Sequence, residues 1–276
     1  MSRTLGCVVS LALWAAGVAA QGVLVAPHAV YIDHRTRSGS ILLYNPNPEP
    51  VEVAISTLFG YPVTDSIGQL TLRVVERPDS SQPSAASWLQ AFPRRLTVAP
   101  LERQTVRLLA TPPAGLADGE YWARLVITAK GGQVAIGGVA DTANIRVGLT
   151  LEVRTIIGVA YRKGPLQTSV ALSGLRARVA QDSLQVRVRL ERKGNAAFVG
   201  TVRGELVDST GVVVARFNSP LGVYYQIEPR FAAYTGALPA GRYRLRLDIS
   251  TLREDLPPEV VLPAPAVLDS AEIRLP

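Results

Sequence analysis

Cysteine is almost absent from this chain of 276 residues, since Cys7 is the only one and it lies in the apolar stretch at the N-terminus. The remainder of the chain can therefore form no intrachain disulfide, no thiol nucleophile and no thiolate metal site. Small secreted domains usually need disulfides. A chain of this length can instead build one or two ordinary hydrophobic cores without them.

Sequence motifs of catalysis are also missing. Histidine occurs twice, at His28 and His34, and this spacing in a segment broken by Pro27 matches no established zinc-ligand pattern. There is no G-x-S-x-G elbow of a serine hydrolase, and no glycine-rich loop between a strand and a helix that could hold a phosphate. We therefore predict that the protein is not an enzyme and uses no metal or other cofactor.

Lysine is scarce, because only Lys130, Lys163 and Lys193 occur, so the net charge of +7 comes mainly from arginine. The arginines alternate with other residues, as in 187–189 and 242–246, which is typical of the solvated face of a sheet. No basic block with interleaved aromatic residues is present. Nucleic-acid binding is therefore not predicted.

Long apolar runs are missing everywhere except at the N-terminus. Arg3 precedes an almost unbroken apolar run from Leu5 to Val18, and small residues follow at 18–20. This is the pattern of a secretory signal peptide, and the run is shorter than the roughly 20 apolar residues of a spanning helix. We predict that residues 1–20 are removed on export and that the mature chain has no integral membrane segment. An uncleaved N-terminal anchor is the alternative.

The chain does contain a succession of short β-branched segments of alternating polarity, separated by Gly, Pro, Asn and Asp. Helical periodicity is nearly absent. The clearest segments are 40–44, 51–57, 105–109 and 121–128 in the first half, and 183–191, 199–208 and 243–249 in the second. Short strands at such regular spacing predict a β-sandwich or a barrel.

One hexapeptide pattern, L-x-x-G-x-Y, occurs twice, and each copy leads directly into an alternating segment. Its tyrosines are Tyr121 and Tyr243. In immunoglobulin-like sandwiches a tyrosine at this place turns its hydroxyl back to an upstream backbone group, and the feature is known as a tyrosine corner. The two tyrosines are therefore predicted structural tyrosine corners, one in each of two sandwiches. Two unrelated loops before strands are the alternative.

We predict an all-β fold with two immunoglobulin-like β-sandwich domains in tandem after the signal peptide. The Gly- and Pro-containing segment Arg162–Pro165 is the predicted hinge, which places the domains at residues 21–162 and 163–276. A glycine-rich linker is predicted from Lys130 to Asn144. The proline-rich segment from Pro257 to Pro265 is interpreted as a final connection or as an extended docking segment.

Five segments of the first half carry a resemblance to a known family. They are SILLYN at 40–45, FPRRLTVAP at 92–100, QTVR at 104–107, GEY at 119–121 and LVI at 125–127. Together they resemble the N-terminal domain of periplasmic pilus-assembly chaperones, the PapD-like family. Members of that family lend an edge strand to pilin-like subunits that lack a final strand. The resemblance implies a periplasmic location, a secreted or pilin-like subunit as partner, and an outer-membrane usher as a further one.

The lent strand has a counterpart in an extended segment that ends near residue 161. Five apolar residues alternate there with polar ones or glycine, so pleating places them on one face. They are Ile145, Val147, Leu149, Leu151 and Val153. We predict that this edge binds the partner by strand addition. The alternative is that all five residues face the core of their own domain.

In the family, a basic pair in the cleft between the domains grips the C-terminal carboxylate of the subunit. The resemblance places its arginine at His28 and its lysine near Ile156 or Gly158, and neither position carries a fixed charge. Three nearby cations can replace the pair, because guanidinium groups bind carboxylates in bidentate fashion. These predicted anchors are Arg154, Arg162 and Lys163. The alternative is that they are ordinary solvated surface residues.

The function predicted from the sequence is a periplasmic, chaperone-like protein that binds secreted or fimbrial subunits by donating an edge strand. The second hypothesis is a structural or adhesive envelope protein with two immunoglobulin-like domains and no chaperone activity. A carbohydrate-binding sandwich is the third, and it would need an exposed aromatic platform. Its candidate residues are Tyr224, Tyr225 and Tyr234.

Overall fold

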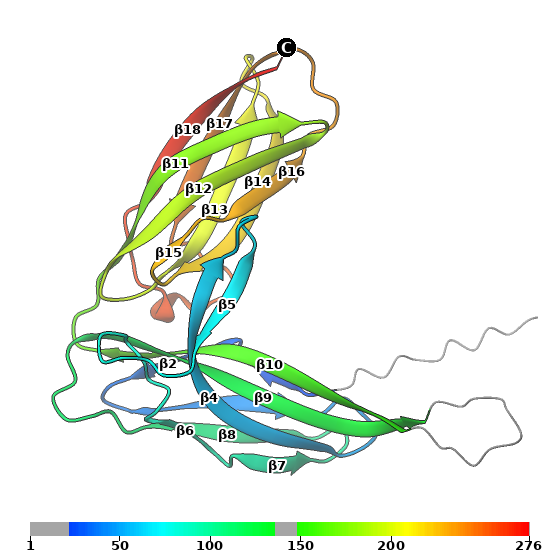
Figure 1. Cartoon of the computed structure of the whole chain (residues 1–276), viewed down its shortest axis with the longest axis vertical. Helices are drawn as coiled ribbons and strands as arrows, with labels where there is room; N and C mark the ends of the chain where they lie inside the picture. The colour runs from blue at the N-terminus through cyan, green and yellow to red at the C-terminus, as the bar shows by residue number, and fades with distance from the viewer. Residues whose placement is uncertain (1–21, 136–147, 276) are drawn as a thin grey trace, which may run out of the picture.

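A computed structural model describes residues 22–135 and 148–275, and this part of the chain is nearly all β (Figure 1). One 3-10 turn, η1 (Pro258–Val260), is its only helical element. The predicted all-β fold is therefore confirmed. Among the described residues no helix has the length and apolarity needed to cross a bilayer. The predicted signal peptide, residues 1–20, lies outside the described residues.

The first sandwich consists of two facing sheets with a buried apolar core between them. The smaller sheet has the order β1 (Leu24–Ala26), β3 (Ser38–Tyr44), β8 (Arg103–Ala110), β6 (Leu89–Phe92). The larger sheet has the order β2 (Ala29–Asp33), β10 (Gly148–Lys163), β9 (Gly119–Ala135), β4 (Val51–Thr64), β5 (Leu70–Val75), with β7 (Arg95–Val98) beside β4. Alternation explains the core, because in β8 every second residue from Val106 to Ala110 is buried.

The N-terminal segment contributes to both sheets of this sandwich. β1 pairs antiparallel with β3, and after Pro27 the chain continues as β2, which pairs in parallel with β10 at Gly158–Arg162. Proline has no backbone N–H to give to a ladder, so the change of sheet falls where pairing would be interrupted in any case. The change of sheet at Pro27 places β2 along only one end of β10.

The second sandwich follows a turn at Gly164 and has its own apolar core. One sheet contains β11 (Thr168–Ala180), β12 (Ser183–Gly194), β15 (Gln226–Ile227) and β16 (Arg230–Tyr234). The other has the order β14 (Val213–Val223), β13 (Phe198–Val207), β17 (Gly241–Ser250), β18 (Val267–Leu275). Two sandwiches in tandem are therefore present, as the sequence predicts.

Both tyrosines of the repeated hexapeptide bond to the chain four residues upstream. The hydroxyl of Tyr121 donates to the carbonyl of Ala117 at 2.9 Å, and that of Tyr243 donates to the carbonyl of Pro239 at 2.8 Å. The ring of Tyr243 is buried in the second core. Each bond holds the loop before β9 or β17 against the body of its sandwich.

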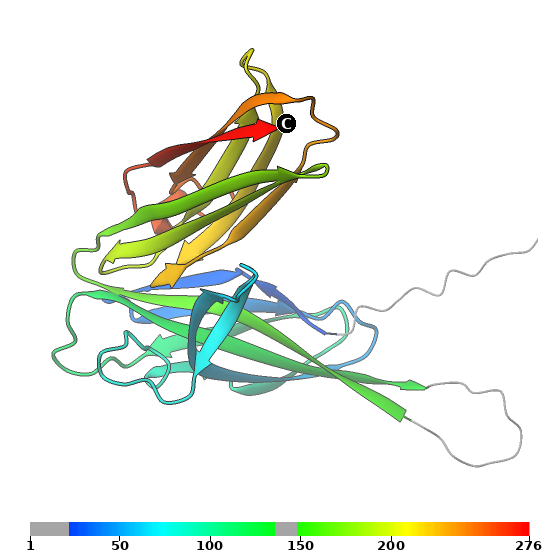
Figure 2. The same ribbon diagram turned by 45° about the horizontal axis from the view of Figure 1, so that its top comes forward.

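The β4–β5 hairpin leaves the first sandwich and reaches the second one, as both views show (Figures 1 and 2). At its tip Thr64 Oγ1 accepts a hydrogen bond from the backbone N–H of Glu228 at 2.8 Å. The carbonyl of Gly68 accepts one from the N–H of Arg230 at 2.9 Å. A Cβ atom on Gly68 would lie 2.8 Å from the Cβ of Arg230, so glycine permits this close approach.

The first residues of the linker predicted from Lys130 to Asn144 belong to strand β9. β9 continues through Gly131 and Gly132 to Ala135, and the register of its pairing with β10 shifts between Thr150 and Leu151. Glycine in a strand often accompanies such a bulge. The first part of the predicted linker is therefore wrong, and residues 136–147 lie outside the described part of the chain.

Candidate functional site

One edge of β10 is paired over only part of its length. β9 accompanies β10 from Gly148 to Lys163, whereas on the other side β2 pairs only with residues 158–162. Among the described residues, no strand pairs with this second edge between positions 148 and 157. An open edge presents N–H and C=O groups that can pair with another chain. We call this segment of β10 the free edge.

The residues predicted for the donated strand fall at the outer end of β10. Ile145 and Val147 lie outside the described residues, and of Leu149 only the backbone is described. Leu151 is 42% exposed, and Val153 is half-buried.

The same face of β10 continues inward with three residues of the first core: Ile157, Val159 and Tyr161. This row of side chains is therefore buried in the first core at its inner end and exposed to solvent at Leu151. Donation of these residues to a partner stays a prediction.

The three predicted anchor residues do not form one site. Arg154 is exposed and pairs with Glu152 at 2.7 Å. Lys163 lies 3.5 Å from Asp118 and also donates to a backbone carbonyl. The third, Arg162, is mostly buried and pairs with a buried carboxylate. Each of the three charges is therefore already balanced within the first sandwich.

Arg162 belongs to a network that joins the two sandwiches. Its Nε donates to Glu120 at 2.8 Å, and its Nη1 donates to the carbonyl of Val260 at 2.6 Å. The side chain of Glu120 is 2% exposed and also accepts hydrogen bonds from Trp122 Nε1 at 2.8 Å and from the N–H of Ala197 at 3.2 Å. Ala197 and Val260 lie in the second half of the chain, so one carboxylate holds groups from both sides of the junction.

Aromatic rings fill the rest of this junction. Trp122 is buried, and the rings of Tyr224 and Tyr225 lie edge-on to it at centroid distances of 4.7 and 5.5 Å. Tyr225 also contacts Tyr61 at 4.7 Å. These two tyrosines therefore stabilise the contact between the sandwiches and do not form the aromatic platform considered for sugar binding. Tyr234, the third candidate, is exposed at the far end of β16.

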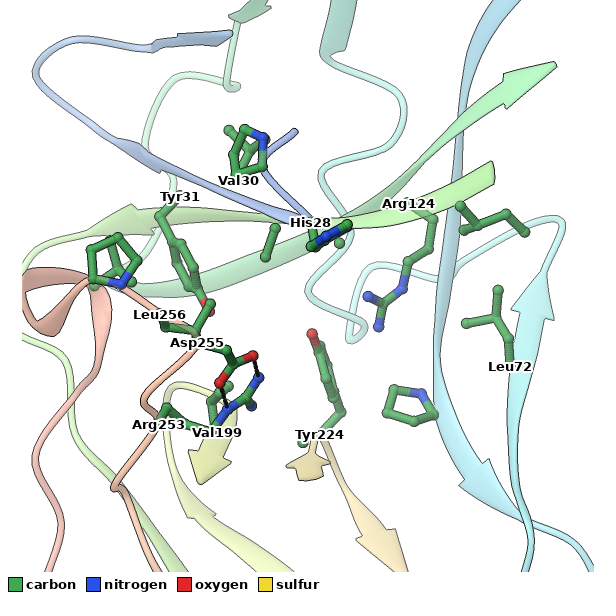
Figure 3. Close-up of a pocket in the computed structure, with 18 of the residues that line it drawn as sticks. His28, Val30, Tyr31, Leu72, Arg124, Val199, Tyr224, Arg253, Asp255 and Leu256 are labelled. Carbon is green, nitrogen blue, oxygen red and sulfur yellow. Dashed lines mark hydrogen bonds and ion pairs between the residues drawn. The ribbon is translucent and has the colours of Figure 1, made fainter. Parts of the chain in front are cut away.

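A cleft of about 910 Å³ opens between the sandwiches, beside this junction (Figure 3). Residues of β2, β3, β4, β5, β9 and β10 line it from the first sandwich, and Val199 and the segments near residues 222–224 and 253–260 line it from the second. We call it the interdomain cleft. Its polar and ionisable lining residues include His28, Tyr31, Arg124, Tyr224, Arg253 and Asp255.

Arg124 supplies the cleft with a fixed positive charge. Its Nε donates to the carbonyl of Gly60 at 2.9 Å, and its guanidinium lies 4.9 Å from the centre of the Tyr224 ring. Gly158 is its cross-strand partner on β10, and a Cβ there would lie 2.8 Å from Nη1 of Arg124. The guanidinium therefore passes over a position that has no side chain.

The other charges of the cleft are compensated. Arg253 binds Asp255 through two hydrogen bonds of 2.7 and 2.6 Å, which lower the pKa of Asp255 and raise that of Arg253. Burial raises the pKa of Tyr31 to about 12, so its phenol stays neutral. Of the described residues that line the cleft, Arg124 is the one arginine or lysine without a carboxylate partner.

Apolar side chains stand beside Arg124 on the cleft wall. Ile156 of β10 is 46% exposed, and Leu70 and Leu72 of β5 are exposed as well. Figure 3 shows Leu72 and Arg124 lining the same cleft. A cleft wall that combines exposed apolar side chains with one guanidinium suits a ligand that combines apolar groups with a carboxylate.

Sequence reasoning missed Arg124, although a signal was present. Gly158 lies between the β-branched residues Ile157 and Val159, and glycine within a strand often marks the close approach of another group. The register that brings Arg124 over Gly158 links positions on two strands, and the sequence alone does not reveal it.

The histidines form no metal site in the described part of the chain. His34 bonds through Nδ1 to the hydroxyl of Tyr161, and no group of three or more metal-ligating side chains occurs among the described residues.

Comparison with known proteins finds similarity at the level of structure. A scan against models of known protein families gives no match, and no curated protein matches the sequence. The YadV chaperone is 13% identical, with a TM-score of 0.47, covering 91% of this chain and 100% of its own. The Pseudomonas aeruginosa CupB2 chaperone is 12% identical, with a TM-score of 0.40 and coverages of 91% and 100%.

A further match is the Salmonella enterica SafA pilin in complex with the SafB chaperone, at 11% identity, a TM-score of 0.43 and coverages of 90% and 96%. These similarities extend over about nine-tenths of the chain. Because the identities are low, we infer the function from the geometry of the free edge and of the interdomain cleft.

Proposed function

We propose that this protein is a periplasmic, chaperone-like protein that binds a secreted or pilin-like subunit. In this proposal the free edge of β10 adds a strand to the subunit, and Arg124 binds the subunit's C-terminal carboxylate. The observation that supports it is the position of Arg124, since its cross-strand neighbour Gly158 is the residue at which β2 begins to pair with β10. The free edge and the uncompensated charge therefore meet at one point.

This geometry gives the bound strand a direction and a length. A strand laid along the free edge must end where β2 takes over the pairing, which is beside Arg124, and a carboxylate at that end meets the guanidinium. The rest of the bound strand runs outward past Leu151 toward position 148. At about 3.3 Å per residue, the free edge offers roughly 33 Å of backbone for pairing.

Main-chain hydrogen bonds along this edge would supply affinity, and pockets for alternate side chains would supply selectivity. The exposed Ile156 and Leu72 would cover apolar side chains near the carboxylate.

We further propose domain limits at residues 21–162 and 163–276. They are supported by two separate cores, which draw on residues 23–161 and 170–273.

The test is co-purification of the exported protein from its native envelope, followed by affinity measurement on the recovered partner. Leu151→Glu places a charge on the donated face and should abolish recovery. Arg124→Gln removes the anchor and should weaken binding about ten- to a hundredfold, the range of a hydrogen bond to a charged group.

Two matched variants serve as controls. Arg154→Gln removes a neighbouring exposed arginine that Glu152 already neutralises, and Leu268→Glu adds a charge at an exposed leucine of the second sandwich. Both should bind as the wild type does. If no partner is recovered, or if the same partner survives Leu151→Glu, strand donation is wrong and a structural or adhesive envelope protein becomes the better hypothesis.

A further inference from the structure

Three arginines stand side by side on the outer face of the second sandwich. Arg176 of β11 lies directly opposite Arg187 of β12, and Arg187 lies directly opposite Arg230 of β16. Residues opposite one another in antiparallel strands point to the same face. Figure 1 shows the three strands next to one another. Arg178, two residues beyond Arg176, points to this face as well.

The four side chains line one hollow of about 480 Å³. The tip of the β4–β5 hairpin closes one side of it with Ser66 and Ile67. Nη2 of Arg187 donates to the carbonyl of Ser66 at 2.8 Å. The hollow is therefore built from both sandwiches, at the point where the hairpin tip contacts the second one.

None of these arginines forms an ion pair with an aspartate or glutamate of the described residues. Two acids that lie close in sequence to lining residues of the hollow, Asp65 before Ser66 and Glu228 before Arg230, have other partners. Asp65 accepts the N–H groups of Ile67 and Gln69 within the hairpin turn, and Glu228 pairs with Arg189 at 3.4 Å. Like charges directly opposite one another in a sheet destabilise it. A bound anion would offset the repulsion between the four guanidinium groups around this hollow.

We propose that the hollow lined by Arg176, Arg178, Arg187 and Arg230 binds a phosphate-class oxyanion. Planar guanidinium groups match the oxygens of phosphates and carboxylates in bidentate fashion. A single carboxylate would leave three of the four charges unbalanced, whereas a phosphate monoester or inorganic phosphate brings up to two negative charges and three or four oxygens. This site lies outside the interdomain cleft and does not depend on the proposed function.

Calorimetric titration of the full mature chain with inorganic phosphate at low ionic strength tests the site. Arg176→Gln is the informative variant, because no side-chain hydrogen bond or ion pair is found for Arg176 among the described residues. We expect it to lower phosphate affinity at least about tenfold. Arg274→Gln is the control, since Arg274 faces Arg242 across β17 and β18, and the next arginine on that face, Arg244, pairs with Glu272. It should leave the affinity unchanged. No binding to the wild type, or an equal loss in both variants, would overturn the proposal.

Thermal unfolding gives a second readout. Phosphate should raise the Tm of the wild type and not that of Arg176→Gln. Without phosphate the variant should be at least as stable as the wild type, because a repulsive neighbour is removed. A large loss of Tm in phosphate-free buffer would show that contacts within the protein hold Arg176, and would count against the site.

The source of the phosphate is decided with vesicles. Sedimentation with phosphatidylcholine vesicles, with and without phosphatidic acid, tests a lipid headgroup as the bound group. Binding that needs phosphatidic acid and is lost in Arg176→Gln identifies a headgroup. Binding of free phosphate without vesicle binding identifies a soluble phosphate. Failure of both arms refutes the site.

Discussion

Glu120→Gln removes one negative charge from the junction between the two sandwiches and leaves the shape of the side chain. The mostly buried Arg162 then lacks a counter-ion, and breaking one partner of a buried ion pair costs about 3–5 kcal/mol. The glutamine oxygen can still accept from Trp122 and from the N–H of Ala197, so we expect the lower end, about 3 kcal/mol. For a chain of this size that corresponds to a fall in Tm of about 6–12 °C. Thermal and urea unfolding of the mature protein measure it.

The control is an exposed ion pair of similar geometry. Arg244 and Glu272 lie 3.1 Å apart on the surface of the second sandwich, and Glu272→Gln should cost about 0–1 kcal/mol. The double variant Glu120→Gln/Arg162→Met removes both buried charges and should recover part of the loss, since it leaves no unpaired cation. The reasoning is refuted if Glu120→Gln stays within about 1 kcal/mol of the wild type, or if the double variant is less stable than the single one.

Two further changes test individual contacts. Tyr243→Phe removes the hydroxyl that donates to Pro239, and it should lower the free energy of unfolding by about 0.5–1.5 kcal/mol; an unchanged urea midpoint would contradict this. Gly158→Ala puts a methyl group where the end of the Arg124 side chain lies, so the protein should fold as before while its affinity for the co-purified partner falls toward that of Arg124→Gln. Full affinity of the alanine variant would show that the place of the guanidinium over Gly158 does not matter.

Local sequence signals predict much of the fold. Alternation depends only on pleating, so segments such as 183–191 and 243–249 fall within the strands β12 and β17. The hexapeptide ending at Tyr243 also acts locally, because its hydrogen bond spans four residues. Strand ends were less predictable. The alternation of β4 weakens after residue 57, yet β5 pairs with it as far as Thr64, and this cross-strand partner is not visible in the pattern of β4 alone.

The candidate site could be predicted only in part, because it depends on register between distant segments. The apolar row of β10 is visible in the sequence, whereas the length of its free edge depends on β2, more than a hundred residues earlier. The predicted anchors, Arg154, Arg162 and Lys163, are cations that the sequence places near the expected cleft. Arg124 lies on the neighbouring strand, and only the pairing of β9 with β10 brings it there.

Within β10, the role of each residue depends on what covers the strand's second edge. At positions 158–162 β2 completes the sheet, and Val159 and Tyr161 are buried in the first core. Between positions 148 and 157 no strand of the described residues pairs with the second edge, and at Leu151 the same face of the strand is exposed. A proline in the chain before β2 delays its pairing, since proline cannot donate to a ladder. In the proposed binding mode, the point where β2 starts therefore sets both the length of edge left for a partner and the place where the partner's strand ends. Arg124 lies at that place, and this is the reason for proposing a carboxylate terminus as its ligand.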